Sequence, residues 1–113
     1  MPFPHDDKKD PYKEYALNVK PEAGEMLGDH AAFLARLSRP AADRLINVFS
    51  REVNSLKTMP DRYTWLDRPG VPRRKYRKLP FEKHYMILYH IDDDIVHIDA
   101  VVDARMDFVR FIG

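Results

Sequence analysis

Two histidines that flank a short acidic turn have the clearest potential for chemistry in this chain. His90 and His97 lie on either side of Asp92-Asp93-Asp94, with Asp99 close by. If the flanking segments pair as a hairpin, the two imidazoles face each other and could act as an acid–base couple near neutral pH. They could also ligate a metal, but so few ligands from a single hairpin are a weak signal, and we predict no metal site. The purely structural alternative is a stacked cross-strand pair on a half-exposed sheet face.

A cluster of basic residues is the second candidate feature. It consists of five cations within six residues, interrupted only by Tyr76: Arg73, Arg74, Lys75, Arg77 and Lys78. Because the net charge of the whole chain is only +1, any electrostatic attraction has to come from such local features. The cluster could hold RNA phosphates without sequence preference. It could instead receive an acidic segment of a protein partner, or it could be an edge strand whose charges discourage aggregation.

The first half of the chain predicts a strand followed by two helices. A strand is expected over Tyr12–Val19, with one face formed by Tyr15, Leu17 and Val19. A helix is expected to start at Pro21, with the apolar stripe Ala23, Leu27, His30, Leu34 and Leu37. Ser38 is expected to cap a second helix, with the stripe Ala42, Leu45, Phe49, Val53 and Leu56. So short a link predicts an antiparallel helical hairpin.

The second half of the chain predicts a long loop and three strands. Residues 60–72 contain three prolines and a glycine, and we expect this segment to fold back and bury Trp65 and Leu66. Strands are expected over Arg73–Phe81, Tyr85–Ile91 and Ile95–Asp103. The resulting order, β-α-α-β-β-β, predicts an α+β fold in which a twisted, mainly antiparallel sheet carries the helical hairpin on one face.

The hairpin turn fixes the expected register of the last two strands. Aspartates tolerate the positive φ of tight turns, so Asp93-Asp94 is the expected two-residue loop. The face under the helices then has the pairs Ile91 with Val96, Tyr89 with Ile98, and Ile87 with Ala100. The opposite face has His90 with His97 and Leu88 with Asp99, with Met86 near Val101. One face is therefore expected to be uniformly apolar and the other mixed.

Length and composition set limits on the class of protein. A chain of 113 residues with 44% hydrophobic and 33% charged residues fits one globular domain, expected over residues 12–113 after a flexible lead-in at 1–11. The lead-in is polar and proline-rich, so we expect neither a signal peptide nor a membrane anchor, and a cytoplasmic location. There is no cysteine, and neither a glycine-rich phosphate loop nor a strong metal-ligand spacing is present. We therefore expect no cofactor.

The order and spacing of several short motifs resemble RelE/ParE toxins of type II toxin–antitoxin systems, which include plasmid stabilisation proteins. The resemblance covers roughly residues 12–108. Its motifs are Lys20-Pro21-Glu22-Ala23, Ser38 with Pro40, Met59-Pro60, Tyr76-Arg77-Lys78-Leu79, Tyr85-Met86-Ile87-Leu88-Tyr89 and Val102-Asp103-Ala104-Arg105-Met106-Asp107. The resemblance implies a cognate antitoxin that wraps and neutralises the toxin. It also implies one of two targets: RelE-like members cleave mRNA on the ribosome, whereas ParE-like members poison DNA gyrase.

The resemblance also bears on individual residues. Arg105 matches an arginine that follows the last strand in RelE-like nucleases, where it could clamp a phosphate; the alternative is a salt bridge to Asp103 or Asp107. Met86 departs from the pattern, because RelE-like nucleases usually have an arginine there. RelE-like nucleases also use an aromatic residue near the C-terminus. In this chain only Phe108 or Phe111 could supply it, and neither has an acidic hydroxyl.

These features together predict a toxin that inhibits growth, with catalytic candidates Arg105, His90 and His97 and a binding surface at residues 73–78. Whether the chain is a ribosome-dependent endoribonuclease (an mRNA interferase) or acts on gyrase is left open. The alternative is a non-catalytic binding module that keeps the fold and the antitoxin interaction but has lost toxicity.

Overall fold

The structure is a computed structural model that describes residues 13–112, so the predicted lead-in at residues 1–11 lies outside the described residues. Its elements are β1 (Ala16–Val19), α1 (Pro21–Ala35), α2 (Arg39–Ser55), β2 (Arg77–Phe81), β3 (Tyr85–Asp92) and β4 (Ile95–Asp103). Two short 3-10 helices lie at Pro60–Arg62 and Val109–Phe111. The predicted element order and the α+β class are confirmed.

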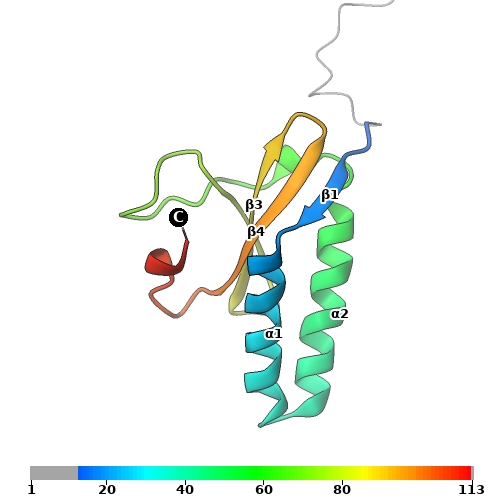
Figure 1. Ribbon diagram of the computed structural model, residues 1–113, viewed down its shortest axis with the longest axis vertical. Coiled ribbons are helices and arrows are strands. Elements are labelled where there is room, and N and C mark those ends of the chain that lie inside the picture. Colours follow the sequence, from blue (N-terminus) through cyan, green and yellow to red (C-terminus); the bar gives the residue numbers. More distant parts are fainter. Residues whose placement is uncertain (1–12, 113) are drawn as a thin grey trace, which may run out of the picture.

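The four strands form one sheet in the order β1-β4-β3-β2. β1 runs parallel to β4, and the other neighbours are antiparallel. In Figure 1, α1 and α2 lie side by side on one side of the sheet, while the loop before β2 and the C-terminal segment lie on the other. Among the described residues, no helix is long and apolar enough to cross a membrane.

The helical hairpin forms largely as the sequence predicts. Ser38 is the N-cap of α2, and its Oγ accepts a hydrogen bond from the Ala41 N–H at 3.3 Å. The predicted apolar stripe of α2 is buried along its whole length. The predicted apolar stripe of the first helix wrongly includes Leu37, which lies beyond the end of α1 and is 75% exposed. The chain turns there to start α2, so Leu37 projects at the tip of the hairpin.

The first strand is shorter than predicted. It begins at Ala16, preceded by a single bridge between Glu14 and Thr58. Of the residues predicted to share one face of this strand, Tyr15 is buried, whereas Val19 is 41% exposed. β1 is an edge strand with a neighbour on one side only, which leaves its last side chain less covered than alternation alone implies.

The predicted strand at 73–81 also starts later, because the chain turns before it. Arg74 has a positive φ of 56°, and the strand begins only at Arg77. The preceding loop pairs with this edge: Leu66 N–H donates to the Tyr76 carbonyl at 2.7 Å, and Lys78 N–H donates to that of Thr64 at 2.9 Å. Leu66 is 3% exposed, so the expectation that the loop buries Leu66 is confirmed.

Trp65, the other residue that the loop was expected to bury, is only half-buried. The guanidinium of Arg77 lies 3.9 Å from the centroid of its ring. Stacking on a cation, rather than insertion into the core, therefore fixes the tryptophan.

The β3–β4 hairpin has the predicted register near its turn and a different one beyond a bulge. The pairs Ile91–Val96, His90–His97 and Tyr89–Ile98 are as predicted, and Asp93 has a positive φ of 52°. The register then shifts between Leu88 and Tyr89, so that Asp99 is the extra residue. The remaining pairs are Leu88–Ala100, Ile87–Val101 and Met86–Val102, which corrects the predicted pairs Leu88–Asp99 and Ile87–Ala100 and the predicted proximity of Met86 to Val101.

The sheet is covered on both faces. The helices pack on a core that includes Tyr85, Ile87, Tyr89, Val96 and Ile98, as expected. The opposite face was expected to be mixed, but its centre is a second apolar cluster. We call this the second core: Leu66, Tyr76, Met86, Leu88, Ala100, Val102 and Phe108. The bulge places Ala100 and Val102 opposite Leu88 and Met86, and the loop and C-terminal segment close over them.

Candidate functional site

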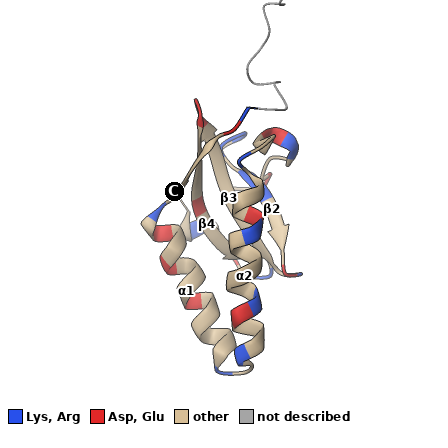
Figure 2. Ribbon diagram, turned by 90° about the vertical axis from the view of Figure 1, so that its right-hand side faces the viewer, with Lys and Arg blue, Asp and Glu red and all other residues tan. Residues whose placement is uncertain are grey.

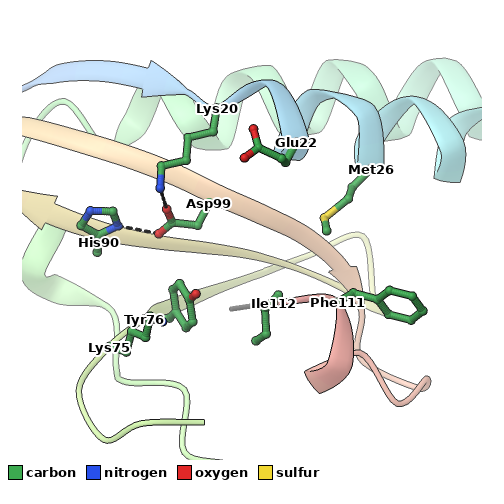
Figure 3. Close-up of a pocket in the computed structure, with 9 residues that line it drawn as sticks. All are labelled: Lys20, Glu22, Met26, Lys75, Tyr76, His90, Asp99, Phe111 and Ile112. Atoms are coloured by element: carbon green, nitrogen blue, oxygen red, sulfur yellow. Dashed lines mark hydrogen bonds and ion pairs between the residues drawn. The ribbon is translucent and has the colours of Figure 1, made fainter.

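A charge cluster centred on Asp99 lies where β1 meets α1 (Figure 3). Lys20, the last residue before α1, places its Nζ 2.8 Å from Asp99 Oδ1. His90, on β3, places its Nδ1 2.6 Å from Asp99 Oδ2. The side chain of Asp99 is 8% exposed, so this carboxylate is buried between two basic partners. Because bulges redirect side chains, the extra residue in β4 accounts for the position of Asp99 beside His90.

The contact with Asp99 orients the imidazole of His90. Its Nδ1 is held by the carboxylate, and no hydrogen bond within residues 13–112 engages its Nε2. The ring stacks on that of His97, with centroids 4.9 Å apart and planes at 19°. His97 Nδ1 in turn accepts a hydrogen bond from the Asn18 side-chain amide at 2.9 Å. A carboxylate that fixes one imidazole nitrogen and leaves the other open is an arrangement suited to acid–base chemistry.

The cluster also affects its lysine. The hydrogen bond to Asp99 is the main cause that raises the pKa of Lys20 above its usual value, although partial burial opposes the shift. Lys20 therefore stays protonated at neutral pH and neutralises the buried carboxylate.

A depression of about 420 Å³ opens beside this cluster. Its charged lining residues are Lys20, Glu22, Lys75 and Asp99, His90 also lines it, and its apolar walls are Met26, Tyr76, Phe111 and Ile112 (Figure 3). It therefore combines lysines, carboxylates and aromatic surface.

The basic cluster at 73–78 reaches the same histidine from the other side. A second depression, of about 380 Å³, is lined by Arg74, Lys75, Arg77 and His90 together with Tyr15 and Trp65. Three carboxylates also line it: Asp61, Asp92 and Asp93. The structure thus brings three of the five predicted basic residues beside His90. Arg73 and Lys78 line neither depression.

Arg77 also has a clear structural role. Its Nη1 donates to the carbonyl oxygens of Tyr63 at 2.7 Å and Asp61 at 3.1 Å. Together with its stacking on Trp65, these bonds tie the loop before β2 to the strand.

Arg105 is paired with Asp103 and is separate from the histidines. Its Nε and Nη2 donate to the two carboxylate oxygens of Asp103 at 3.1 and 2.8 Å. The hydrogen bonds from Arg105 lower the pKa of Asp103, and the same contact raises the pKa of Arg105. Asp103 lies six residues after His97 along β4, which corresponds to roughly 20 Å along the strand. Arg105 and His90 therefore do not form one site, and of the two alternatives for Arg105 the salt bridge is present.

Met86 is 7% exposed and belongs to the second core, with Phe108 in the same cluster. Phe111, in contrast, is 61% exposed at the rim of the depression beside His90. Within residues 13–112, no three His, Asp or Glu side chains come together as a metal site requires.

Comparison with known proteins identifies a family from the sequence and a matching fold from the structure. A sequence model described as the ParE toxin of the type II toxin–antitoxin system parDE matches residues 17–108. A solved structure described as the chromosomal ParDE TA system from P. aeruginosa has a TM-score of 0.65 and 15% sequence identity, covering 80% of this chain and 97% of that one. At this identity the likeness supports the fold alone. No curated protein sequence matches the chain. The family match covers most of the chain and the fold agrees with it, so the chain belongs to the ParE toxin family of type II toxin–antitoxin systems.

Proposed function

We propose that the chain is a toxin that arrests growth by acting on DNA gyrase and that a cognate antitoxin neutralises it. The observation that carries the choice of target is the second core. The resemblance to RelE-like toxins implies that RNA cleavage in that group uses basic and aromatic residues on an open sheet face and near the C-terminus. Here the centre of that face is filled by apolar side chains under the loop and the C-terminal segment. A closed apolar face cannot bind the phosphates of mRNA.

Two single residues support the same choice. Met86 occupies the strand position of the usual arginine, and its burial leaves no route for it to contact RNA. The guanidinium of Arg105 is occupied by both carboxylate oxygens of Asp103, and a phosphate would have to displace that pair. A protein target requires neither residue to be free, so binding to gyrase fits better than phosphodiester cleavage.

The His90 site favours a second candidate, ribosome-dependent mRNA cleavage through different residues. The imidazole oriented by Asp99 could transfer a proton, and Arg74 and Lys75 lie beside it. In-line attack by a 2′-hydroxyl needs such a base together with cations near the phosphate. The family match favours gyrase over this candidate, and either target would place the protein in the cytoplasm.

A paired experiment separates the candidates. New mRNA 5′ ends are mapped across the transcriptome minutes after a controlled pulse of expression in a bacterium. In parallel, purified gyrase is incubated with supercoiled plasmid and the chain, and linear DNA released by denaturing the enzyme is quantified. We expect growth arrest, trapped linear DNA and no new 5′ ends.

Other outcomes have definite meanings. New ends within translated codons that disappear in a His90→Gln variant would identify the ribosome, and not gyrase, as the target. Normal growth with neither product would identify a binding module that has lost toxicity. An Asn47→Gln variant, which changes an exposed side chain of α2 that lines neither depression beside His90, controls for expression and folding.

A further inference from the structure

A groove with an apolar floor lies between α1 and the segment that follows β4. It has a volume of about 490 Å³, and its apolar lining residues are Met26, Val101, Val102, Met106, Phe108 and Phe111. Met106 and Phe111 are each 61% exposed. Adjacent large apolar side chains this exposed are typical of an interaction surface rather than of an inert one.

The rim of the groove is acidic. Glu22, Glu25 and Asp29 line it from α1, and Asp107 lines it from the C-terminal segment. The spacing of three and four residues places the three helix carboxylates on one face of α1, and Figure 2 shows these acidic positions recurring along a helix that contains no lysine or arginine.

These carboxylates have few partners of their own. Glu25, Asp29 and Asp107 make no side-chain hydrogen bond or ion pair with the residues that the structure describes. Like charges at this helical spacing repel one another, so the free protein carries a small destabilising term that a cationic partner would remove.

We propose that this groove binds a basic amphipathic segment of the antitoxin, with apolar side chains on the floor and lysines or arginines over the carboxylates. The assignment to the antitoxin rests on the proposed function, whereas the chemistry of the segment rests on the groove alone. Carboxylates at the rim exclude phosphate-bearing partners, because a nucleic acid or an anionic lipid surface would be repelled. An occupant that also carries apolar side chains would bury Met106 and Phe111, which are each 61% exposed.

The test uses the full chain and two synthetic helical peptides of equal length. Both carry leucine and phenylalanine at helical spacing; one has flanking lysines and arginines, and its twin has glutamates and aspartates. Affinities are measured by fluorescence anisotropy, and contacts are mapped by chemical-shift changes in the labelled chain. We expect the basic peptide to bind at least about tenfold more tightly than the acidic one, with shifts at Met106 and Phe111 and with affinity that falls as salt rises.

Matched variants locate the binding. The charge reversal Glu25→Lys/Asp29→Lys is expected to lower the affinity for the basic peptide at least about tenfold. The same charge change at exposed sites elsewhere, Asp43→Lys/Asp67→Lys, is expected to change this affinity less than about twofold. For the floor, Met106→Ser/Phe111→Ser is expected to abolish binding. Phe33→Ser/Leu37→Ser, which alters equally exposed apolar residues at the hairpin tip, is expected to leave it intact.

Equal affinity for the two peptides, equal losses in test and control variants, or shifts confined to another surface would overturn the groove as the site. Co-production of the basic peptide should also restore growth to cells arrested by the chain, and binding without such rescue would overturn the assignment to the antitoxin. A chain that binds the basic peptide without arresting growth would refute the proposed toxicity and leave the groove's specificity established. The two failures are therefore distinguishable.

Discussion

Replacing Met86 with arginine tests whether the sheet face opposite the helices is closed. Met86 is 7% exposed, and none of its neighbours in the second core carries a carboxylate: Leu66, Tyr76, Leu88, Ala100, Val102 and Phe108. An arginine at this position would therefore be buried without an ion-pair partner. If the face were open, as in an RNA-binding sheet, the same arginine would point into solvent at little cost.

The expected loss can be worked out from this environment. Removing a buried methionine forfeits about 1.5–3 kcal/mol of hydrophobic stabilisation. The larger side chain strains a packed cluster by about 1–3 kcal/mol more. Desolvation of an unpaired guanidinium adds to both, so we expect Met86→Arg to lower the free energy of unfolding by at least about 4 kcal/mol. A domain of this size has a total of about 5–15 kcal/mol, so the variant should be at best marginally folded.

Urea denaturation followed by circular dichroism measures this change. Met86→Leu is the control, because a swap that conserves volume in a core usually costs less than about 1.5 kcal/mol. A Met86→Arg protein within about 1 kcal/mol of the wild type, with an unchanged m-value, would mean that the arginine reaches solvent. The face would then be open, and the main argument against RNA cleavage would fail.

Three further changes test the interactions that hold the fold together. Ser38→Ala removes the N-cap of α2 and should lower the free energy of unfolding by about 1 kcal/mol, measured by urea denaturation. Burial raises the pKa of Tyr89, whose hydroxyl donates to the Pro60 carbonyl at 2.5 Å. Tyr89→Phe should lower the free energy of unfolding by about 1–3 kcal/mol, because the carbonyl loses its donor. Because Tyr89 ionises only at a pH above the usual tyrosine range, the variant should show the same ultraviolet titration as the wild type within that range. Hydrogen bonds from Arg105 lower the pKa of Asp103, so their stabilisation is present above the unfolded value near ~3.9 and is lost as the pH falls through the lower folded value. Stability should therefore decline less steeply with acid in Asp103→Asn than in the wild type, and equal slopes would contradict the assignment.

Local patterns in the sequence predict the elements well because each carries its own signal. Proline after Lys20 and serine before α2 mark helix starts, and aspartates at the hairpin tip accept the positive φ that a two-residue loop needs. The strand β4 has the predicted bounds because a tight turn precedes it and β-branched and other apolar residues continue to its end. These signals act within a few residues, so tertiary context rarely overrides them.

The site could be predicted only in part because its geometry depends on a bulge. Perfect alternation pairs Leu88 with Asp99, and the extra residue at Asp99 has no sequence signal that separates it from an ordinary strand position. Lys20 was missed for a related reason: its contact with Asp99 depends on the parallel pairing of β1 with β4, which connects residues about eighty positions apart. The predicted His90–His97 pair needed only the local turn, and it is present.

Although the net charge is only +1, basic and acidic residues are concentrated on different parts of the surface. Basic residues gather around the loop before β2, whereas the exposed face of α1 carries carboxylates without a lysine or arginine among them. Glu22, Met26 and Phe111 nevertheless line both the depression beside His90 and the acidic groove. A segment seated in the groove would therefore reach the rim of the His90 site without contacting the histidine. The groove shares no lining residue with the depression that contains Arg74 and Arg77, so the same segment would leave that basic surface open to a second partner.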